Sequence, residues 1–458
     1  MSFFFFDPKD IHDIAWVKRT LEYVSLVKGF KEKLEDDPEK VLKEYNIPLS
    51  VQDISFDTAV VENNHIKMRP EYPDSAAAKY AAFMEKKYDF REILKENCKP
   101  DNEVMNKWRT RQMGRCNIEL GARTMGIVHV PLAIELADGC SVGCKFCGLN
   151  AKKLAGVFEC TEENAKLFRD VCTHAYNIIG RAAGMGMLYF ASEPFDNPDY
   201  EKFLDIFRGI FDVTPQITTA RAVNNIERLR PLLKDINEKQ NVIYRFSALS
   251  EAVVLKLFEA FTPEELILTE ILPQYDDAPT ANFVSVGRNA TEEDCGDTIS
   301  CVTGFVVNMY AHRMRLTTPT NADKNHPTGE IILDERIFTD ADDFAVKLNE
   351  MIKQNMVNII GPNDRIRLRK NIKISYEDKQ VVLQTDKGIK FNMEYTDDNS
   401  KELYKTLFEK LKRGYNTKRE VVAEFTKDKE MVIQTELLYF ILNKWWSLGL
   451  IETESGRI

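Results

Sequence analysis

The chain has 458 residues, of which 44% are hydrophobic and 29% are charged. This composition supplies large buried cores and excludes a disordered or fibrous protein, and the length predicts about two to four domains. The 62 basic and 72 acidic side chains give a net charge of −10, which argues against a protein that coats nucleic acid.

No apolar run approaches the roughly 18 residues of a membrane helix, and the first ten residues lack the features of an export signal. We therefore expect a cytoplasmic protein without membrane association. The nine cysteines of such a chain are expected to remain reduced thiols rather than to form disulfides.

The N-terminal part of the chain has a helical pattern. Apolar residues recur at helical spacing from Ile11 to Arg115, and Asp37-Pro38 is typical of a helix start. Residues 63–74 contain two prolines and are expected to be a connection. The sequence thus predicts a helical segment over residues 1–126.

Beyond Ile127 the chain alternates between short apolar runs and longer amphipathic stretches. The strand-like runs are 131–136, 187–191, 216–219, 242–247, 266–272 and 302–310, with helical stretches at 161–179, 200–211, 225–237 and 251–261. Because parallel strands need crossover helices, this alternation predicts an α/β fold with a parallel sheet or barrel over residues 127–330. The polar stretch 274–298 is expected to be a loop over one end of the barrel.

The last part of the chain predicts a smaller domain. Residues 331–364 are expected to form a helical connector. After it, Ile372, Ile374 and Tyr376 alternate with polar residues, as in a small antiparallel strand. Helical patterns and a capping box at residues 417–420 follow. Three strands followed by three short helices predict a winged-helix-like domain over residues 365–458.

The strongest chemical signal is a loop with three cysteines. Cys140, Cys144 and Cys147 form a C-x₃-C-x₂-C run directly after a predicted strand. Three thiolates on one tight loop can hold three corners of an iron–sulfur cube and leave the fourth iron open. The alternative is a structural zinc site, which would need a fourth ligand such as Cys160 or His129.

This loop resembles the defining loop of the radical S-adenosylmethionine (SAM) superfamily, including the aromatic Phe146 before the third cysteine. The resemblance implies a partial (β/α)6 barrel and a [4Fe-4S] cluster on Cys140, Cys144 and Cys147. It also implies that SAM binds the open iron, with Phe146 among its contacts, and is cleaved reductively to a 5′-deoxyadenosyl radical.

Further candidates for SAM binding lie at the ends of later strands. The stretch Ala191-Ser192-Glu193-Pro194 resembles the Gly-Gly-Glu-Pro of this superfamily, which implies that Ser192 and Glu193 bind the amino group of SAM. Thr218-Thr219, Arg245 and Ser247 are candidates for ribose and carboxylate contacts, because polar residues in apolar barrel strands tend to face the cavity. For Arg245, pairing with an acidic neighbour is equally open.

Over almost its full length the chain resembles the radical SAM peptide epimerases that act on ribosomal peptides of the proteusin kind. The resemblance is carried by residues 135–144 and 146–148, by Cys116 and by Cys301, whereas Lys145 stands where an aromatic residue is expected. It implies that the radical removes a Cα hydrogen from an L-residue and that Cys301 returns a hydrogen from the opposite face, which yields the D-residue. Cys295 is the reserve donor.

The C-terminal domain resembles the PqqD-like recognition elements of such maturases. This resemblance implies that the leader of a ribosomal precursor peptide adds as a strand to the small sheet, while a flavodoxin or ferredoxin supplies electrons. A DNA-binding winged helix is the rival, but residues 366–458 hold 18 basic and 15 acidic side chains. That balance is too even for strong phosphate binding, so we expect no nucleic-acid partner.

Two other functions stay open at this point. One is a radical SAM maturase that forms thioether or carbon–carbon crosslinks in a precursor peptide, although crosslinking leaves Cys301 without a task. The other is a non-enzymatic, zinc-bearing adaptor that binds peptide or nucleic acid.

Overall fold

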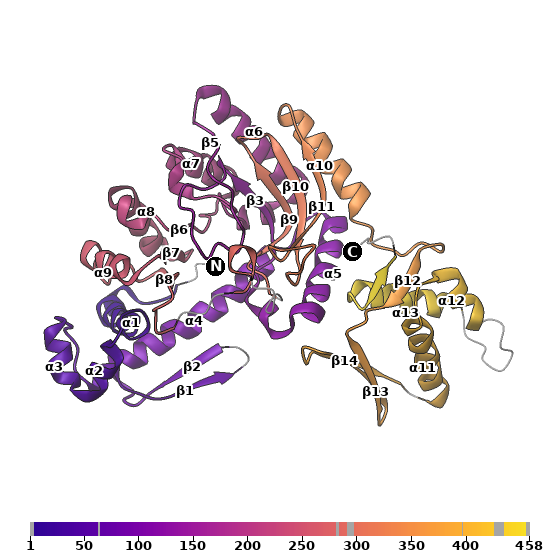
Figure 1. Cartoon of the computed structure of the whole chain (residues 1–458), viewed down its shortest axis with the longest axis horizontal. Helices are drawn as coiled ribbons and strands as arrows, with labels where there is room; N and C mark the ends of the chain where they lie inside the picture. Colours follow the sequence, from indigo (N-terminus) through magenta and orange to yellow (C-terminus); the bar gives the residue numbers. More distant parts are fainter. Residues whose placement is uncertain are drawn as a thin grey trace.

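The computed structural model describes residues 4–62, 65–280, 284–290, 297–395, 397–425 and 435–454 (Figure 1). Its helices and strands form a mixed α/β arrangement with a smaller module at the C-terminal end of the chain. None of the helices in these ranges is both long and apolar enough to cross a membrane.

The N-terminal region is mostly helical, as predicted. Its helices are α1 (Ile11–Leu26), α2 (Phe30–Asp36), α3 (Pro38–Glu44), α4 (Ala76–Asn97) and α5 (Glu103–Leu120). The helix start at Asp37-Pro38 is confirmed, because the Asp37 carboxylate accepts a hydrogen bond from the Lys40 backbone N–H at 3.1 Å.

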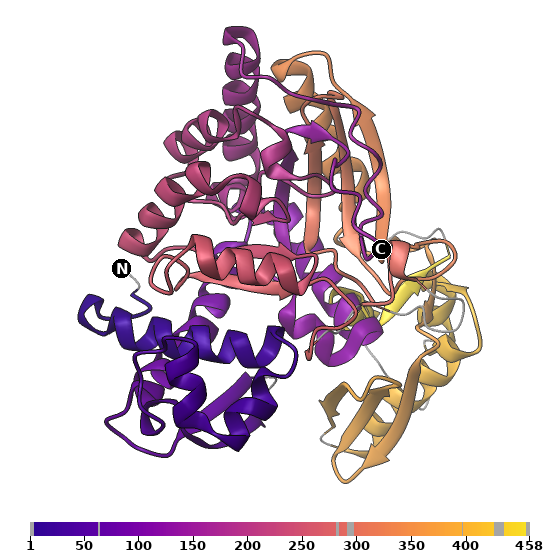
Figure 2. The same ribbon diagram turned by 60° about the vertical axis from the view of Figure 1, so that its left-hand side comes forward.

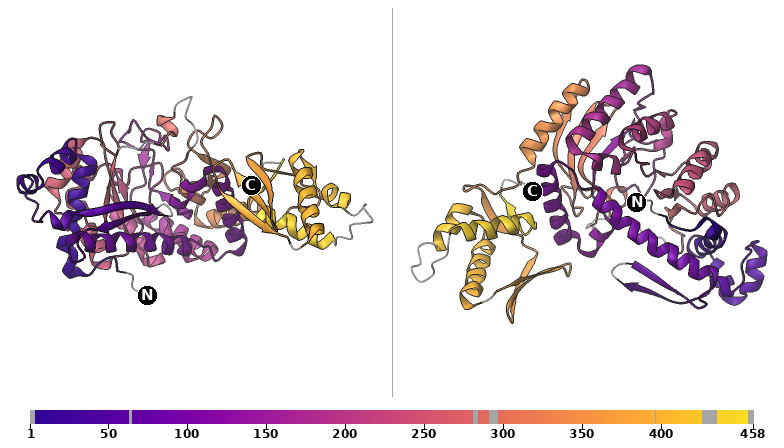
Figure 3. Two further views of the ribbon diagram at one scale, coloured as in Figure 1. Left: turned by 90° about the horizontal axis from the view of Figure 1, so that it is seen from below. Right: turned by 180° about the vertical axis from the view of Figure 1, so that it is seen from behind.

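A β-hairpin interrupts this helical segment, so the prediction of helices alone over residues 1–126 was wrong. Strand β1 (Phe56–Glu62) pairs antiparallel with β2 (His65–Pro70), and the hairpin lies beside α4 (Figures 1 and 3). The β1 sequence FDTAVVE is rich in aromatic and β-branched residues, which favour strands. The predicted connection at residues 63–74 therefore includes the second strand.

The main sheet begins with four strands in the order β11 (Glu330–Ile337), β10 (Arg313–Pro319), β9 (Val302–Asn308) and β3 (Val130–Glu135). Strands β3 and β9 are parallel, whereas β9, β10 and β11 are successively antiparallel. Strand β11 corrects a second prediction, because residues 331–337 belong to the sheet and only α10 (Ala341–Asn355) is helical in the expected connector.

The remaining parallel strands continue from β3. Isolated parallel bridges join Ala133 to Met187 and Met187 to Gln216, and β6 (Thr218–Thr219), β7 (Tyr244–Ala248) and β8 (Thr269–Pro273) follow in parallel. The predicted strand at 187–191 is therefore reduced to the single bridging residue Met187, and the one at 216–219 to the bridge at Gln216 and the two residues of β6. The late strand β9 lies next to the first strand, β3, rather than after β8, and the described strands form an open sheet.

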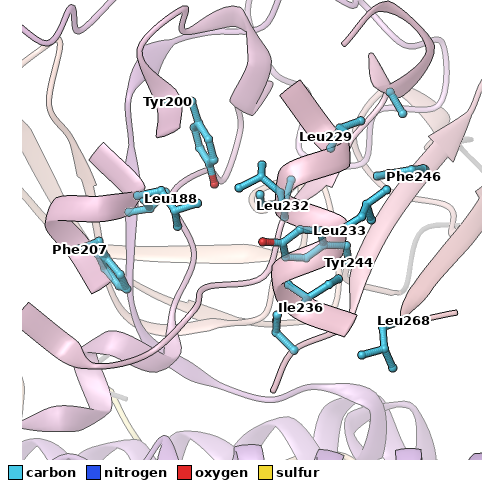
Figure 4. Packing of buried hydrophobic residues seen from close by; sticks show 14 of the residues in the cluster. Leu188, Tyr200, Phe207, Leu229, Leu232, Leu233, Ile236, Tyr244, Phe246 and Leu268 are labelled. Carbon is cyan, nitrogen blue, oxygen red and sulfur yellow. The ribbon is translucent and has the colours of Figure 1, made fainter. Parts of the chain in front are cut away.

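Crossover helices α6 (Glu162–Ile179), α7 (Tyr200–Phe211), α8 (Ile226–Lys239) and α9 (Glu251–Ala260) occupy the stretches predicted for them. They cover the outside of the parallel strands, as Figure 2 shows. Figure 4 shows Phe207 of α7 and Leu233 of α8 in the same buried cluster as Tyr244 of β7. The parallel strands and their helices are therefore confirmed as elements of the predicted fold.

The C-terminal module contains the predicted three strands and three helices. Strands β13 (Ile372–Glu377), β14 (Gln380–Thr385) and β15 (Lys390–Glu394) form an antiparallel sheet, followed by α11 (Asp398–Lys412), α12 (Lys418–Phe425) and α13 (Thr435–Ser447). The capping box is confirmed by reciprocal hydrogen bonds between Thr417 and Glu420. A second sheet of β16 (Asn416–Thr417), β12 (Arg365–Leu368) and β17 (Ile451–Thr453) was not predicted.

Helix α5 joins this module to the main sheet. Glu119 accepts hydrogen bonds from Arg369 of the module at 3.1 Å and from Thr320, which follows β10, at 2.9 Å. On the same helix, the Arg111 guanidinium lies 4.4 Å from the ring centre of Trp446. A Cβ on Gly114 would come within 2.5 Å of the Leu448 carbonyl oxygen, so the two backbones touch.

Candidate active site

The three-cysteine loop follows the carboxyl end of β3. The short strands β4 (Ala137–Asp138) and β5 (Gly156–Val157) pair at its base, and the Cys140 backbone N–H donates to the Lys152 carbonyl oxygen at 2.9 Å. Gly139 has φ +96°, and a Cβ there would lie 2.5 Å from the Lys153 carbonyl oxygen. Only glycine fits this turn into the loop.

The three thiols are half-buried and close to one another. Burial raises the pKa of Cys144 to about 11, and negative charge on Cys140 and Cys147 contributes to this rise. Burial also raises the pKa of Cys140, against hydrogen bonds from the backbone of Val142 and Gly143. The Ala151 backbone N–H points at the Cys147 sulfur at 3.4 Å.

This donor set fits an iron–sulfur cluster in its chemistry. Thiolates are the ligands of such clusters, and backbone N–H groups aimed at the sulfurs are among the contacts that tune them. Among the described residues, no three His, Cys, Asp or Glu side chains are grouped as ligands of one metal ion. A cluster does not require that grouping, because each thiolate binds a different iron atom.

His129 is not available as the fourth ligand of a zinc site on this loop. It precedes β3, whereas the loop follows the other end of the strand, a separation of roughly 20 Å for six extended residues. Its imidazole is buried, and its Nδ1 lies 2.8 Å from the Thr303 hydroxyl oxygen. Of the two named candidates for a fourth ligand, this leaves Cys160.

Glu193 lies beside the cysteine loop, close enough for its charge to act on Cys140. It is 4% exposed and precedes the short 3₁₀ turn Pro194–Asp196. Its carboxylate accepts hydrogen bonds from the Thr219 hydroxyl at 2.5 Å and from the backbone N–H groups of Ala220 and Phe195 at 2.9 and 3.2 Å. Burial raises the pKa of Glu193, and its charge in turn contributes to raising the pKa of Cys140.

Thr219, one of the strand-end residues predicted to contact SAM, donates a hydrogen bond from its hydroxyl to the Glu193 carboxylate. Ser192, next to Glu193, is half-buried and exposes part of its surface beside this turn. Phe146 lies within the loop, where the ammonium of Lys145 is 4.8 Å from its ring centre and pairs with Asp276 at 3.0 Å. Lys145 therefore occupies the position where an aromatic residue was expected, and its ammonium covers the ring of its neighbour Phe146.

Asp196, Arg221 and Arg288 also belong to this site, and the sequence analysis did not predict them. Asp196 accepts hydrogen bonds from the Ser141 backbone at 2.8 Å and from Arg221 at 2.7 Å, and so ties the cysteine loop to the Glu193 turn. Arg288 donates to the Cys144 carbonyl oxygen at 3.0 Å from the predicted covering loop. An acidic residue three positions after Glu193 was the available signal for Asp196, whereas Arg288 comes from a distant loop.

Arg245 and Cys301 lie together, at the opposite end of the parallel strands. Cys301 precedes β9, and its carbonyl oxygen accepts a hydrogen bond from the Val130 backbone N–H at 2.9 Å. Arg245 pairs with Glu270 at 2.9 Å, which bears out the acidic-neighbour interpretation. Ser247 is half-buried two residues further along β7, on the same face as Arg245. Cys295 lies outside the described residues.

Cys301 is kept as a neutral thiol. Burial raises its pKa to about 11, although the Arg245 guanidinium acts in the other direction. Tyr189 lies between this thiol and the cysteine-loop end. Burial raises the pKa of Tyr189 to about 12, and negative charge on Cys301 at one end and on Glu193 at the other contributes to the rise. Its hydroxyl donates to Thr218 at 2.7 Å. The same interior face therefore carries polar groups from Cys301 to Glu193.

Comparison with known proteins finds a relative that matches most of the chain. No family model matches the chain. BtrN in complex with AdoMet and 2-DOIA is a solved structure with a TM-score of 0.29 and 11% identity, over 41% of this chain and 72% of that chain. The uncharacterized protein y4wI of Sinorhizobium fredii is 32% identical over 400 residues, or 82% of this chain and 77% of that protein. The chain belongs to the same family as y4wI.

Proposed function

We propose that the protein is a radical SAM peptide epimerase that converts L-residues of a ribosomally synthesised precursor peptide to D-residues. The observation that carries this proposal is the placement of a neutral thiol, Cys301, at one end of the parallel strands and a three-cysteine loop at the other. Inversion at Cα requires removal of hydrogen from one face and its return from the opposite face. A hydrogen-abstracting site at the cysteine loop and a hydrogen donor at Cys301, at opposite ends of the same parallel strands, would approach a peptide between them from opposite faces.

Cys140, Cys144 and Cys147 are the residues that would hold a [4Fe-4S] cluster, with Phe146, Ser192 and Glu193 beside it. Such a cluster with bound SAM would supply a 5′-deoxyadenosyl radical, the species that could remove a Cα hydrogen. Glu193 supports this role because its carboxylate is buried and fixed by three donors, so it offers a preorganised negative group next to the loop.

Cys301 then donates its hydrogen atom to the planar peptide radical and becomes a thiyl radical, which one electron from the flavodoxin or ferredoxin and one proton from solvent convert back to the thiol. The donor must be the protonated thiol; an ordinary thiol is mostly protonated at neutral pH, and the raised pKa of Cys301 keeps it so in mild alkali as well. Arg245 lies beside this thiol and is held by Glu270, so its role is positioning at the Cys301 end rather than contact with the SAM carboxylate. Ser247, on the same strand face, remains a candidate SAM contact.

The C-terminal module would bind the leader of the precursor peptide. Its sheet β13–β14–β15 has β13 and β15 at its two edges among the described residues, and an extended peptide can add to such an edge through main-chain hydrogen bonds. Contacts of α5 hold this module against the main sheet. A flavodoxin or ferredoxin is the proposed electron donor.

The experiment is anaerobic reconstitution with iron and sulfide, followed by incubation with SAM, a reductant and a candidate precursor peptide, sought first among the genes that neighbour the gene for this chain. We expect about four irons per chain, a visible absorption band, deoxyadenosine, and D-residues in the hydrolysed peptide. Zinc without a visible band would refute the cluster and favour the adaptor. Deoxyadenosine with only L-residues in the product would refute the epimerase.

A further inference from the structure

A cavity of about 310 Å³ adjoins Cys301 at the end of the strands that faces α4. Residues at or near the strand starts form one wall, among them Val130, Met187 and Gln216, and α4 forms the other wall with Met84 and Leu94. Figures 1 and 3 show α4 passing along this end of the strands. None of the roles proposed above for the site residues makes use of this cavity.

The charges around the cavity are unbalanced. Lys87 of α4 and Arg245 of β7 both bind the Glu270 carboxylate, each at 2.9 Å, so one carboxylate is shared by two cations. Burial alone would raise the pKa of Glu270, but these two cations outweigh burial and lower it. Arg91 adds a third cation to the lining. The remainder of the wall is largely apolar.

The stereochemistry of inversion directs a side chain toward this cavity. In an L-residue whose Cα hydrogen points to the cysteine-loop end, the other three substituents lean away from that hydrogen, toward Cys301. After the thiol has delivered hydrogen from its own side, the same substituents lean away from Cys301. The L side chain therefore leans toward the cavity, and the D side chain leans away from it.

We propose that this cavity receives the side chain of the residue being converted, and that it accepts uncharged, mainly apolar side chains and rejects cationic ones. The inference rests on the proposed epimerase function. The volume suits one side chain, since an apolar cavity of about 150 Å³ already holds a benzene molecule. A lysine or arginine side chain would be desolvated beside Lys87, Arg91 and Arg245 with the single carboxylate already shared.

The test uses the full-length holoenzyme and two versions of the precursor peptide with Met or Lys at a converted position. These side chains have similar length and differ in charge. We expect conversion to the D-residue to be at least about ten-fold faster for the Met peptide, the size expected when like charges meet away from bulk water. Equal conversion of both peptides would overturn the inference and leave the epimerase proposal intact.

Two variants on α4 locate the effect. Lys87→Met removes a cation from the cavity and should reduce the Met-over-Lys preference several-fold, whereas Lys86→Met, an exposed neighbour on the same helix, should leave it unchanged. The preference is the ratio of the conversion rates of the Met and Lys peptides by the same variant, so a lower amount of active enzyme affects both rates equally and leaves the ratio unchanged. Identical preferences in Lys87→Met and wild type would overturn the cavity assignment. Deoxyadenosine without any D-residue would overturn both the inference and the proposed function.

Discussion

Replacing Gly114 with alanine should loosen the C-terminal module from the main sheet. Gly114 lies inside α5, and a Cβ there would be 2.5 Å from the Leu448 carbonyl oxygen and 2.9 Å from its carbon. Both atoms belong to the backbone and cannot turn aside as a flexible side chain would. The two segments must therefore separate by several tenths of an ångström, which disturbs the neighbouring contact of Arg111 with Trp446.

The magnitude follows from two opposing terms. Alanine in place of glycine inside a helix stabilises a protein by about 0.5–1 kcal/mol. Overpacking of a close contact costs about 1–3 kcal/mol. Gly209→Ala is the matched control, because Gly209 is an exposed position of α7 whose added Cβ would meet nothing within 4 Å. We expect the free energies of unfolding of the two variants to differ by about 1–3 kcal/mol, with Gly114→Ala the less stable.

Urea unfolding measures this difference, and hydrogen exchange locates it. In Gly114→Ala, the amides of α13 and of the segment 448–454 should exchange faster, while those of the parallel strands stay protected. If both alanine variants are equally stable and show the same exchange in α13, the proposed contact between α5 and the module is refuted.

Three further predictions concern the chemistry. Cys144→Ala should lose cluster absorbance and SAM cleavage together, and retention of both would disprove the cluster assignment. Cys301→Ala should keep the cluster and form deoxyadenosine with little D-residue. The control is Cys172→Ala, which removes a buried thiol of α6 and should behave as wild type. A normal yield of D-residue from Cys301→Ala would exclude Cys301 as the hydrogen donor. Because the pKa of Cys301 is about 11, its S–H persists in mild alkali, so the ratio of D-residue to deoxyadenosine should stay level between about pH 7 and 9. A fall of that ratio centred near pH 8.5, the ordinary thiol pKa, would contradict the burial of this thiol.

Local patterns predicted much of the fold. The helices α4 and α6 to α9 follow from amphipathic spacing, and the capping box at Thr417 and Glu420 forms as its sequence indicates. The hairpin β1–β2 was missed because it lies between prolines in a segment that is otherwise helical. Strand β11 was missed because only its pairing with β10 distinguishes it from a helix of similar polarity.

The site was predictable where neighbouring residues carry the chemistry. The cysteine loop and Glu193 come from short motifs, and the structure brings them together. For Arg245, a polar residue in an apolar strand, the sequence left a SAM contact and an acidic partner equally open, and the structure shows the acidic partner, Glu270. Arg288 joins the loop from more than 140 residues away, and no local pattern reports such a contact.

Conversion in deuterium oxide tests the central claim most directly. Thiol hydrogens exchange with solvent, so hydrogen returned by Cys301 carries deuterium. We predict that each D-residue in the product gains one mass unit, with the deuterium at Cα, and that deoxyadenosine forms alongside it. A peptide that instead loses two mass units would show that the enzyme forms crosslinks, and D-residues without deuterium would contradict hydrogen return from a thiol.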